Sequence, residues 1–167
     1  MSAVAAKAEL LQLVSFTLGK EEYAVDILRV QEINRMVDIT SIPNAPFDIE
    51  GVINLRGKVI PVVNLRKKFG FDSKEMDSHS RIMVVDVGRT VGVVVDSVSE
   101  VLRLASDTIE PPPSFTANSG SSEYIWGVGK LEDRLLILLD IEKLLKNGES
   151  DYQELMRENT NHTLKEA

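Results

Sequence analysis

One stretch of this chain occurs twice, 76 positions apart, and this repeat limits the possible folds more than any other feature. The first copy spans residues 51–69 and the second spans residues 127–145. Their apolar positions match without a gap, whereas the central tripeptide changes from Arg56-Gly57-Lys58 to Glu132-Asp133-Arg134. A repeated apolar framework with altered turns predicts a fold built from two related units.

The first copy has the pattern of a β-hairpin. Two β-branched runs flank the polar tripeptide, and the central glycine provides the positive φ that a tight reversal needs. Pro61 lies in the second run and cannot donate a backbone hydrogen bond. Its position predicts that this strand is an edge strand or carries a bulge.

Arg56 is the first candidate for a functional residue. A residue kept in both copies is expected to be structural, and Glu132 occupies the position of Arg56 in the second copy. Arg56 also belongs to a group of cations within 13 residues: Arg56, Lys58, Arg66, Lys67 and Lys68. Such a group is either a solvated face or an interface that attracts a complementary partner.

The composition excludes several classes of protein. The 167 residues allow one compact domain or two very small ones. With 43% hydrophobic but only 5% aromatic residues, the core must be aliphatic. A net charge of −7 argues against a nucleic-acid partner, because phosphate binding requires a basic face. The absence of cysteine excludes disulfides and thiolate chemistry.

Membrane insertion and secretion are not expected either. The N-terminal residues lack the long apolar run of a signal peptide. No stretch approaches the roughly 20 apolar residues that span a bilayer. We therefore expect a cytoplasmic protein.

Alternating and aliphatic runs predict short strands throughout both halves. Strands are expected at 12–18, 23–27, 37–42, 52–55, 59–63, 82–87, 91–95, 124–128 and 135–139. A short helical turn is predicted over residues 27–33, and short helices are predicted at 65–69 and 141–146. About five strands per half are too few for a sandwich and suit a small closed barrel.

We therefore predict an all-β fold of two small barrels that share a core within residues 12–146. The first barrel is expected at about 13–70 and the second at about 81–146, with exchange of strands between them left open. Such small units are marginal alone, which favours a common core. Residues 1–11 would form an N-terminal arm and residues 147–167 a polar C-terminal tail.

The sequence offers little material for catalysis. His79 and His162 have no metal-ligand or triad companion at useful spacing. The glycines of residues 127–130 lack the length of a phosphate loop and are explained by the repeated hairpin. We therefore predict no catalytic residue, no metal and no cofactor, and a protein that is not an enzyme.

Several motifs resemble those of CheW-type chemotaxis coupling proteins over about residues 12–146. They include Phe16-Thr17-Leu18-Gly19, Val30-Gln31-Glu32-Ile33, Ile42-Pro43-Asn44-Ala45-Pro46, Gly51-Val52-Ile53-Asn54-Leu55-Arg56-Gly57, Pro61-Val62-Val63-Asn64-Leu65-Arg66, Val91-Gly92-Val93-Val94-Val95-Asp96, Val98-Ser99-Glu100-Val101, and residues 137–145.

The resemblance implies two SH3-like barrels around a shared hydrophobic core, which agrees with the duplication. It also implies a non-catalytic adaptor between the signalling tips of methyl-accepting chemoreceptors and the histidine kinase CheA. The regulatory domain of that kinase has the same fold, so adaptor and kinase can pair barrel to barrel through strand edges. Such an adaptor works in the cytoplasm, at membrane-associated receptor arrays.

The resemblance further implies two sets of contact residues. Val30, Glu32, Asn54 and Arg56 match positions for the receptor tip. Val30 would be an apolar anchor, while Glu32 and Arg56 would fix the register of an amphipathic helix. Alternatively, Glu32 and Arg56 pair with each other, and because Glu100 repeats Glu32 we favour Arg56 of the two.

Two aliphatic residues, Ile82 and Val101, lie near positions that the family uses for the kinase, unless they belong to the core. A different class of function also stays open. A groove between two barrels suits a small-ligand sensor or an enzyme. A detached regulatory piece of a larger kinase is a third possibility, although the chain has no phosphotransfer or nucleotide-binding segment.

Overall fold

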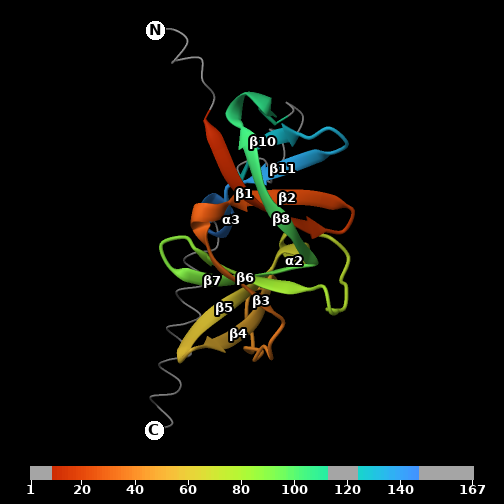
Figure 1. Cartoon of the computed structure of the whole chain (residues 1–167). Helices are drawn as coiled ribbons and strands as arrows, with labels where there is room; N and C mark the ends of the chain where they lie inside the picture. Colours follow the sequence, from red (N-terminus) through yellow and green to blue (C-terminus); the bar gives the residue numbers. More distant parts are fainter. Residues whose placement is uncertain (1–8, 113–123, 147–167) are drawn as a thin grey trace.

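The computed structural model describes residues 9–112 and 124–146, which form two β-sheets and a few short helices. The six-stranded sheet has the order β8-β1-β2-β11-β10-β9, and the five-stranded sheet has the order β3-β6-β7-β5-β4. In Figure 1 the six-stranded sheet lies above the five-stranded one. The predicted all-β class is confirmed.

The strands are β1 (Leu10–Leu18), β2 (Glu21–Asp26), β3 (Val30–Arg35), β4 (Ile49–Leu55), β5 (Lys58–Asn64), β6 (Arg81–Asp86), β7 (Thr90–Val95), β8 (Ser97–Ala105), β9 (Ile109–Glu110), β10 (Ile125–Lys130) and β11 (Leu135–Leu139). The helices are η1 (Ile27–Arg29), α2 (Leu65–Lys68), η2 (Ser106–Thr108) and α3 (Ile141–Lys146). The predicted C-terminal tail and residues 1–8 of the predicted arm lie outside the described residues.

Each sheet takes strands from both halves of the sequence. β6 and β7 complete the sheet of β3, β4 and β5, while β1 and β2 join the strands of the second half. Four pairs join the halves: β5 with β7 and β11 with β2 are parallel, whereas β3 with β6 and β1 with β8 are antiparallel. The halves expected as barrels, 13–70 and 81–146, thus each contribute to both sheets.

The irregularities of the strands repeat as well. Gln31 is skipped where β3 pairs with β6, and Ser99 is skipped where β8 pairs with β1. In the two hairpins, Glu50 and Trp126 are skipped at matching places. β-Bulges of this kind are specific features of a fold rather than defects. Their repetition supports the internal duplication independently of the sequence match.

The duplication also repeats the start of each helix. Asn64 Oδ1 accepts a hydrogen bond from the backbone N–H of Lys67 at 3.2 Å, and Asp140 Oδ1 accepts one from Lys143 at 3.0 Å. These side chains satisfy backbone donors that have no partner within the first turn. A helix therefore follows each hairpin at the same point.

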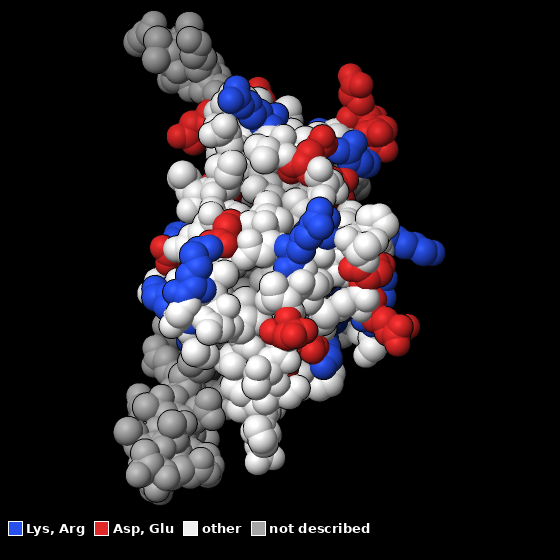
Figure 2. Space-filling view, turned by 60° about the horizontal axis from the view of Figure 1, so that its bottom comes forward, with Lys and Arg blue, Asp and Glu red and all other residues white. Residues whose placement is uncertain are grey.

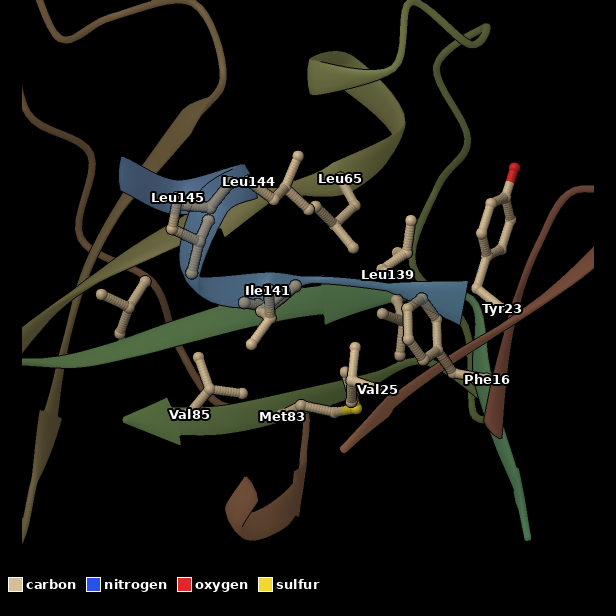
Figure 3. Close-up of a cluster of buried hydrophobic side chains, with 14 of the residues drawn as sticks. Phe16, Tyr23, Val25, Leu65, Met83, Val85, Leu139, Ile141, Leu144 and Leu145 are labelled. Atoms are coloured by element: carbon tan, nitrogen blue, oxygen red, sulfur yellow. The ribbon is translucent and has the colours of Figure 1, made fainter. Parts of the chain in front are cut away.

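Three apolar clusters hold the fold together. The largest lies between the sheets and contains Phe16 and Met83 from different sheets, together with Leu144 and Leu145 of α3 (Figure 3). Two smaller clusters lie inside the five-stranded and the six-stranded sheet. The core is mainly aliphatic, as the composition predicts. Residues 91–95 are buried on both faces because β7 contributes to the shared cluster and to the interior of its own sheet.

The prediction that β5 is an edge strand or carries a bulge is wrong. β5 lies between β4 and β7, and the bulge of this hairpin falls on β4. Pro61 is tolerated because its partner across the hairpin, Val52, directs its backbone N–H and C=O to Thr40, both at 2.9 Å. The parallel ladder with β7 begins only at Val62.

Two other expected elements also differ. Residues 27–33 were expected to form a helical turn, but only Ile27–Arg29 is helical, and Val30 begins β3. Pairing of β3 with β6 determines this outcome, since short apolar spacings fit a helix and a strand equally well. In the expected strand at 37–42, only Thr40 makes a β-bridge, to Val52.

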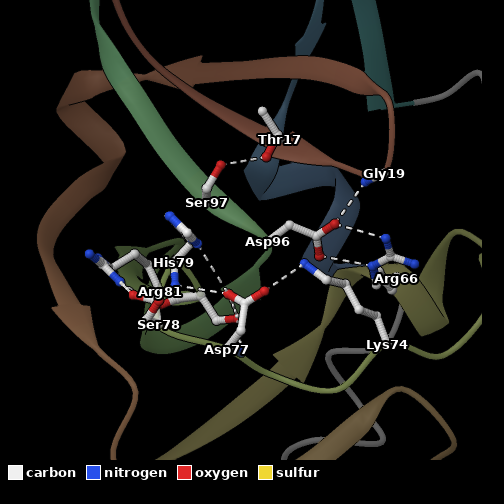
Figure 4. A network of polar contacts seen from close by, with 11 residues as sticks. Thr17, Gly19, Arg66, Lys74, Asp77, Ser78, His79, Arg81, Asp96 and Ser97 are labelled. Carbon is white, nitrogen blue, oxygen red and sulfur yellow. Dashed lines mark hydrogen bonds and ion pairs between the residues drawn. The ribbon is translucent and has the colours of Figure 1, made fainter.

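A polar joint connects the two sheets at the end of β7. Asp96 accepts hydrogen bonds from Arg66 Nε and Nη2, both at 2.8 Å, and from the backbone N–H of Gly19 at 2.8 Å. Figure 4 shows the Asp96 carboxylate between these two partners, with the Thr17–Ser97 hydroxyl pair beside it. Asp96 thus links the β1–β2 turn to α2.

The joint controls the charge of Asp96. Burial raises the pKa of this carboxyl, but the hydrogen bonds from Arg66 and Gly19 outweigh burial and hold the pKa below its ordinary value of 3.8. A carboxyl with a lowered pKa in the folded state stabilises the fold fully above its unfolded pKa. The stabilisation is lost as the pH falls through the folded pKa.

We predict that Asp96→Asn lowers the free energy of unfolding at pH 7, and that its difference from the wild type shrinks as the pH falls below about 4. Urea unfolding between pH 7 and pH 2.5 measures this difference. Asp38→Asn, an exposed change of the same kind, is the control. A difference that is independent of pH would contradict the assignment.

Gly51 of β4 leaves space for the backbone of the segment at Thr40, which passes directly beside it. A Cβ atom at this residue would lie 2.1 Å from the backbone oxygen of Thr40, and φ is +150°. Gly127 begins the second copy, and a Cβ atom there would lie 2.7 Å from the side-chain Cγ2 of Ile109 and 3.1 Å from the backbone oxygen of Glu110 in β9. The glycine that begins each copy thus lies against a neighbouring segment, with backbone as the nearest contact at Gly51 and the Ile109 side chain as the nearest at Gly127.

Gly51→Ala is expected to lower the free energy of unfolding by at least about 2 kcal/mol, because the backbone of Thr40 must move. Gly57→Ala is the matched control, since Gly57 also has positive φ but has open space around its Cα. The control should lose only about 1 kcal/mol. Equal losses in urea unfolding would show that the contact with Thr40 is unimportant.

Candidate functional site

The tip of the β4–β5 hairpin is a turn formed by Arg56 and Gly57. Both residues have positive φ, 51° and 87°. Asn54 supports the turn, since its Oδ1 accepts a hydrogen bond from the backbone N–H of Gly57 at 2.8 Å. Positive φ is uncommon for a residue with a side chain. The turn therefore holds Arg56 at a defined place, with its side chain 72% exposed.

Arg56 forms a two-point ion pair with Glu32 of β3, which we name the first clasp. Arg56 Nη1 donates to Glu32 Oε1 at 3.2 Å, and Nη2 donates to Oε2. Asn34 Nδ2 donates a further hydrogen bond to Glu32 at 2.9 Å. The hydrogen bonds from Arg56 and then Asn34 hold the pKa of Glu32 below its ordinary value. Because β3 and β4 are the outer strands of the five-stranded sheet, the clasp connects its two edges.

Three of the four residues predicted for the receptor thus lie together: Glu32, Asn54 and Arg56. Val30, the fourth, begins β3, is half-buried and packs against the shared core. The pairing of Glu32 with Arg56, which the sequence left open, is present. It orients Arg56 without burying it.

Ile82 and Val101 have different environments. Ile82 is fully buried in the interior of the five-stranded sheet. A side chain with no exposed surface cannot contact a partner, so Ile82 belongs to the core and we withdraw it from the kinase contacts. Val101 is 55% exposed and lies on β8, the outer strand of the six-stranded sheet.

The structure reveals a second clasp that the sequence comparison missed. Arg134 follows the turn of the β10–β11 hairpin, and its Nε contacts Glu22 Oε1 of β2 at 2.7 Å. Its Nη2 contacts Glu100 Oε1 of β8 at 3.1 Å. Glu100 is the counterpart of Glu32, and each of these glutamates follows the bulge of its strand. Although Glu132 replaces Arg56 in the second copy, an arginine near that hairpin tip therefore still reaches the matching glutamate.

The second clasp was missed because Arg134 stands at the position of Lys58, two residues after the counterpart of Arg56. The second turn has no glycine, and neither Glu132 nor Asp133 adopts positive φ. A different residue of the turn therefore reaches the glutamate. The repetition of Glu32 by Glu100 was the one signal in the sequence.

The group of cations around α2 is largely neutralised. Besides Arg56 and Arg66, Lys67 Nζ lies 3.0 Å from Glu50 Oε1 and Lys68 Nζ lies 3.1 Å from Asp48 Oδ2. Figure 2 turns the five-stranded sheet toward the viewer and shows acidic and basic side chains interspersed, with uncharged surface between them. This face therefore presents individually placed charges rather than a field of one sign.

A pocket of about 420 Å³ lies where α2 meets the six-stranded sheet, and its walls include Tyr23, Phe69 and Tyr124. The ring of Phe69 stacks on that of Tyr124 with centroids 5.7 Å apart. Burial, followed by the charge of Glu21, raises the pKa of Tyr23 to about 12. The phenol therefore stays protonated at neutral pH, and the pocket offers apolar walls rather than an acid–base pair.

Within residues 9–112 and 124–146, no group of three or more His, Cys, Asp or Glu side chains could hold a metal ion. None of the helices described there is long and apolar enough to cross a membrane.

Comparison with known proteins decides the family. The model of the CheW-like domain matches residues 12–149. The chain belongs to the CheW family. A chemotaxis protein CheW from Klebsiella aerogenes is 46% identical over 139 residues, which cover 83% of each chain. One from Helicobacter pylori is 36% identical over 139 residues, again 83% of each chain. The crystal structure of the scaffolding protein TtCheW from Thermoanaerobacter tengcongensis superposes with a TM-score of 0.74 at 37% identity, covering 82% of this chain and 93% of that one.

The family confirms the resemblance seen in the sequence. This CheW-family protein is a chemotaxis scaffold, and it is not an enzyme. The two sheets agree with the expected double-barrel architecture. The remaining question is which surfaces serve which partner.

Proposed function

We propose that the protein couples its partners through two separate surfaces. The helical signalling tip of a methyl-accepting chemoreceptor contacts the first clasp, and the regulatory domain of CheA docks on the outer edge of β8. The observation that carries this proposal is the placement of Arg56, which is held rigidly at a protruding turn and is still 72% exposed. With these partners, the protein acts in the cytoplasm at membrane-associated receptor arrays.

The surroundings of the first clasp suit an amphipathic helix. Val59, which faces Asn54 across the hairpin, is 53% exposed. An exposed apolar side chain on the hairpin that presents Arg56 can contact the apolar stripe of a helix, while the charged pair contacts its flanking polar residues. Sequence reasoning did not select Val59, because it is not distinguishable from a core residue without the register.

An exposed ion pair contributes little to stability, since water screens it and ordering two long side chains costs entropy. The first clasp is therefore better suited to orienting Arg56 than to holding the fold. A guanidinium with a defined orientation can bind a carboxylate on the helix at two points. This separates the role of Arg56 in binding from any role in folding.

The outer edge of β8 suits a partner of the same fold. Within the part of the chain that the structure describes, β8 pairs with β1 on one side only, so its other edge presents backbone groups that a strand of the kinase domain can pair with. Val101 adds exposed aliphatic surface next to this edge. Strand pairing combined with an aliphatic contact is a common mode of domain recognition.

We expect Arg56→Glu to weaken binding of a receptor signalling fragment by about tenfold or more, because it places two carboxylates side by side. The melting temperature should change by only a few degrees. Lys58→Glu, the same charge reversal two residues away at an exposed position, should have a much smaller effect. Isothermal titration together with thermal denaturation tests this. Unfolding by Arg56→Glu would make the residue structural and refute the assignment.

Val101→Asp should weaken binding of the CheA regulatory domain by about tenfold or more, because it puts a charge into an aliphatic contact. Binding of the receptor fragment should stay within about twofold of the wild type. Leu135→Asp is the matched control, since Leu135 is 61% exposed on β11, an inner strand of the same sheet. If both substitutions weakened kinase binding equally, the docking surface would not be the edge of β8.

A further inference from the structure

The second clasp differs from the first in what it holds. Arg134 is only 38% exposed, and Glu22, its partner on β2, is 14% exposed. Through Glu22 and Glu100, Arg134 connects the β10–β11 hairpin both to an inner strand and to the outer strand β8. It therefore connects three segments of the six-stranded sheet with one side chain.

The strand β8 is fixed at Glu100 from two directions. The buried hydroxyl of Ser15 accepts a hydrogen bond from the backbone N–H of Glu100 and donates one to its C=O, both at 3.3 Å. These contacts lie directly after the bulge at Ser99. The side chain of Glu100, 50% exposed, is held by Arg134. The backbone and the side chain of Glu100 thus have separate anchors.

We propose that Arg134 is a positioning residue for docking of the kinase. By pairing with both Glu22 of β2 and Glu100 of β8, it fixes the bulge of β8. The fixed bulge in turn sets the outward face on which Val101 lies. The proposal rests on the proposed role of the β8 edge. It assigns no direct contact between Arg134 and the kinase. A bulge re-aims the side chains that follow it, and Val101 is the second residue after Ser99.

A role in positioning is distinct from a role in stability. Glu22 Oε2 is buried and has no hydrogen-bond partner among the described residues. Removing the charge of Arg134 leaves this carboxylate without its counter-charge, and such a change destabilises a fold. Glu100→Gln avoids this problem, because it keeps the contact of Arg134 with Glu22 and releases only β8.

The test uses the full chain with the substitutions Arg134→Gln and Glu100→Gln. Each variant is titrated with the CheA regulatory domain and with a receptor signalling fragment. We expect both to weaken kinase binding by about fivefold or more while receptor binding stays within about twofold. The double variant should lose no more than Arg134→Gln alone, because both substitutions break one contact.

Lys130→Gln is the matched control. Lys130, on β10 of the same hairpin, forms an exposed ion pair at 2.7 Å with Glu110, which lies on β9 rather than on β8. The substitution removes the same charge as Arg134→Gln, so a general effect of charge on kinase binding would appear in both. We expect Lys130→Gln to change neither affinity.

Hydrogen exchange supplies a second readout. Amides of residues 97–105 should exchange faster in Glu100→Gln, while those of residues 90–95 in β7 stay unchanged. Unchanged kinase binding by a folded Glu100→Gln variant would overturn the proposal, and so would parallel losses for kinase and receptor. If Arg134→Gln does not fold, Glu100→Gln alone decides.

Val101→Asp separates failure of this inference from failure of the proposed function. If Val101→Asp weakens kinase binding and Glu100→Gln does not, the β8 edge is the docking surface and Arg134 does not position it. If Val101→Asp has no effect either, the docking surface itself was assigned wrongly.

Discussion

The parallel pairing of β5 with β7 and of β11 with β2 is the constraint on which the rest of the structure depends. Each of these pairs joins one half of the sequence to the other, so neither sheet can form from a single half. The largest apolar cluster then lies between the sheets and receives side chains from both. The duplicated halves are thus interlocked. The glutamates of the two clasps, Glu32 and Glu100, lie on the outer strands β3 and β8, and each of these strands pairs with a strand of the other half.

Local pattern was sufficient to predict the strands of the hairpins and the helices that follow them. Local pattern gave wrong predictions where the pairing of strands determines the environment of a residue. Pro61 indicated an edge strand, because the sequence does not show that Val52 directs its hydrogen bonds to Thr40. Ile82 was a candidate contact residue, because an aliphatic strand residue can be assigned to a face only when its neighbours are known.

The candidate site shows the same division. Arg56 and Glu32 were found from their motifs, and the structure brings them together. Arg134 was missed, because aligning the two copies compares residues at the same position of the sequence. A long arginine side chain can contact the same glutamate from a position two residues away. In the second copy the cation stands at Arg134, directly before β11, and it contacts Glu100, the counterpart of Glu32. A repeat can therefore conserve an interaction without conserving the residue number that provides it.

The two clasps join equivalent hairpins to equivalent strands, β3 and β8, but the two arginines differ in exposure and in partners. Among the described residues, Arg56 is 72% exposed and has one glutamate as its acidic partner, whereas Arg134 is 38% exposed and is shared among Glu22, Glu100 and Asp133. The first arrangement leaves the guanidinium accessible to a foreign carboxylate, while the second uses its donors on the protein itself. The asymmetry between the halves thus lies in exposure rather than in the presence of a cation. Duplication supplied one ion-pair arrangement twice, and the two copies differ in how much of the guanidinium the fold itself uses.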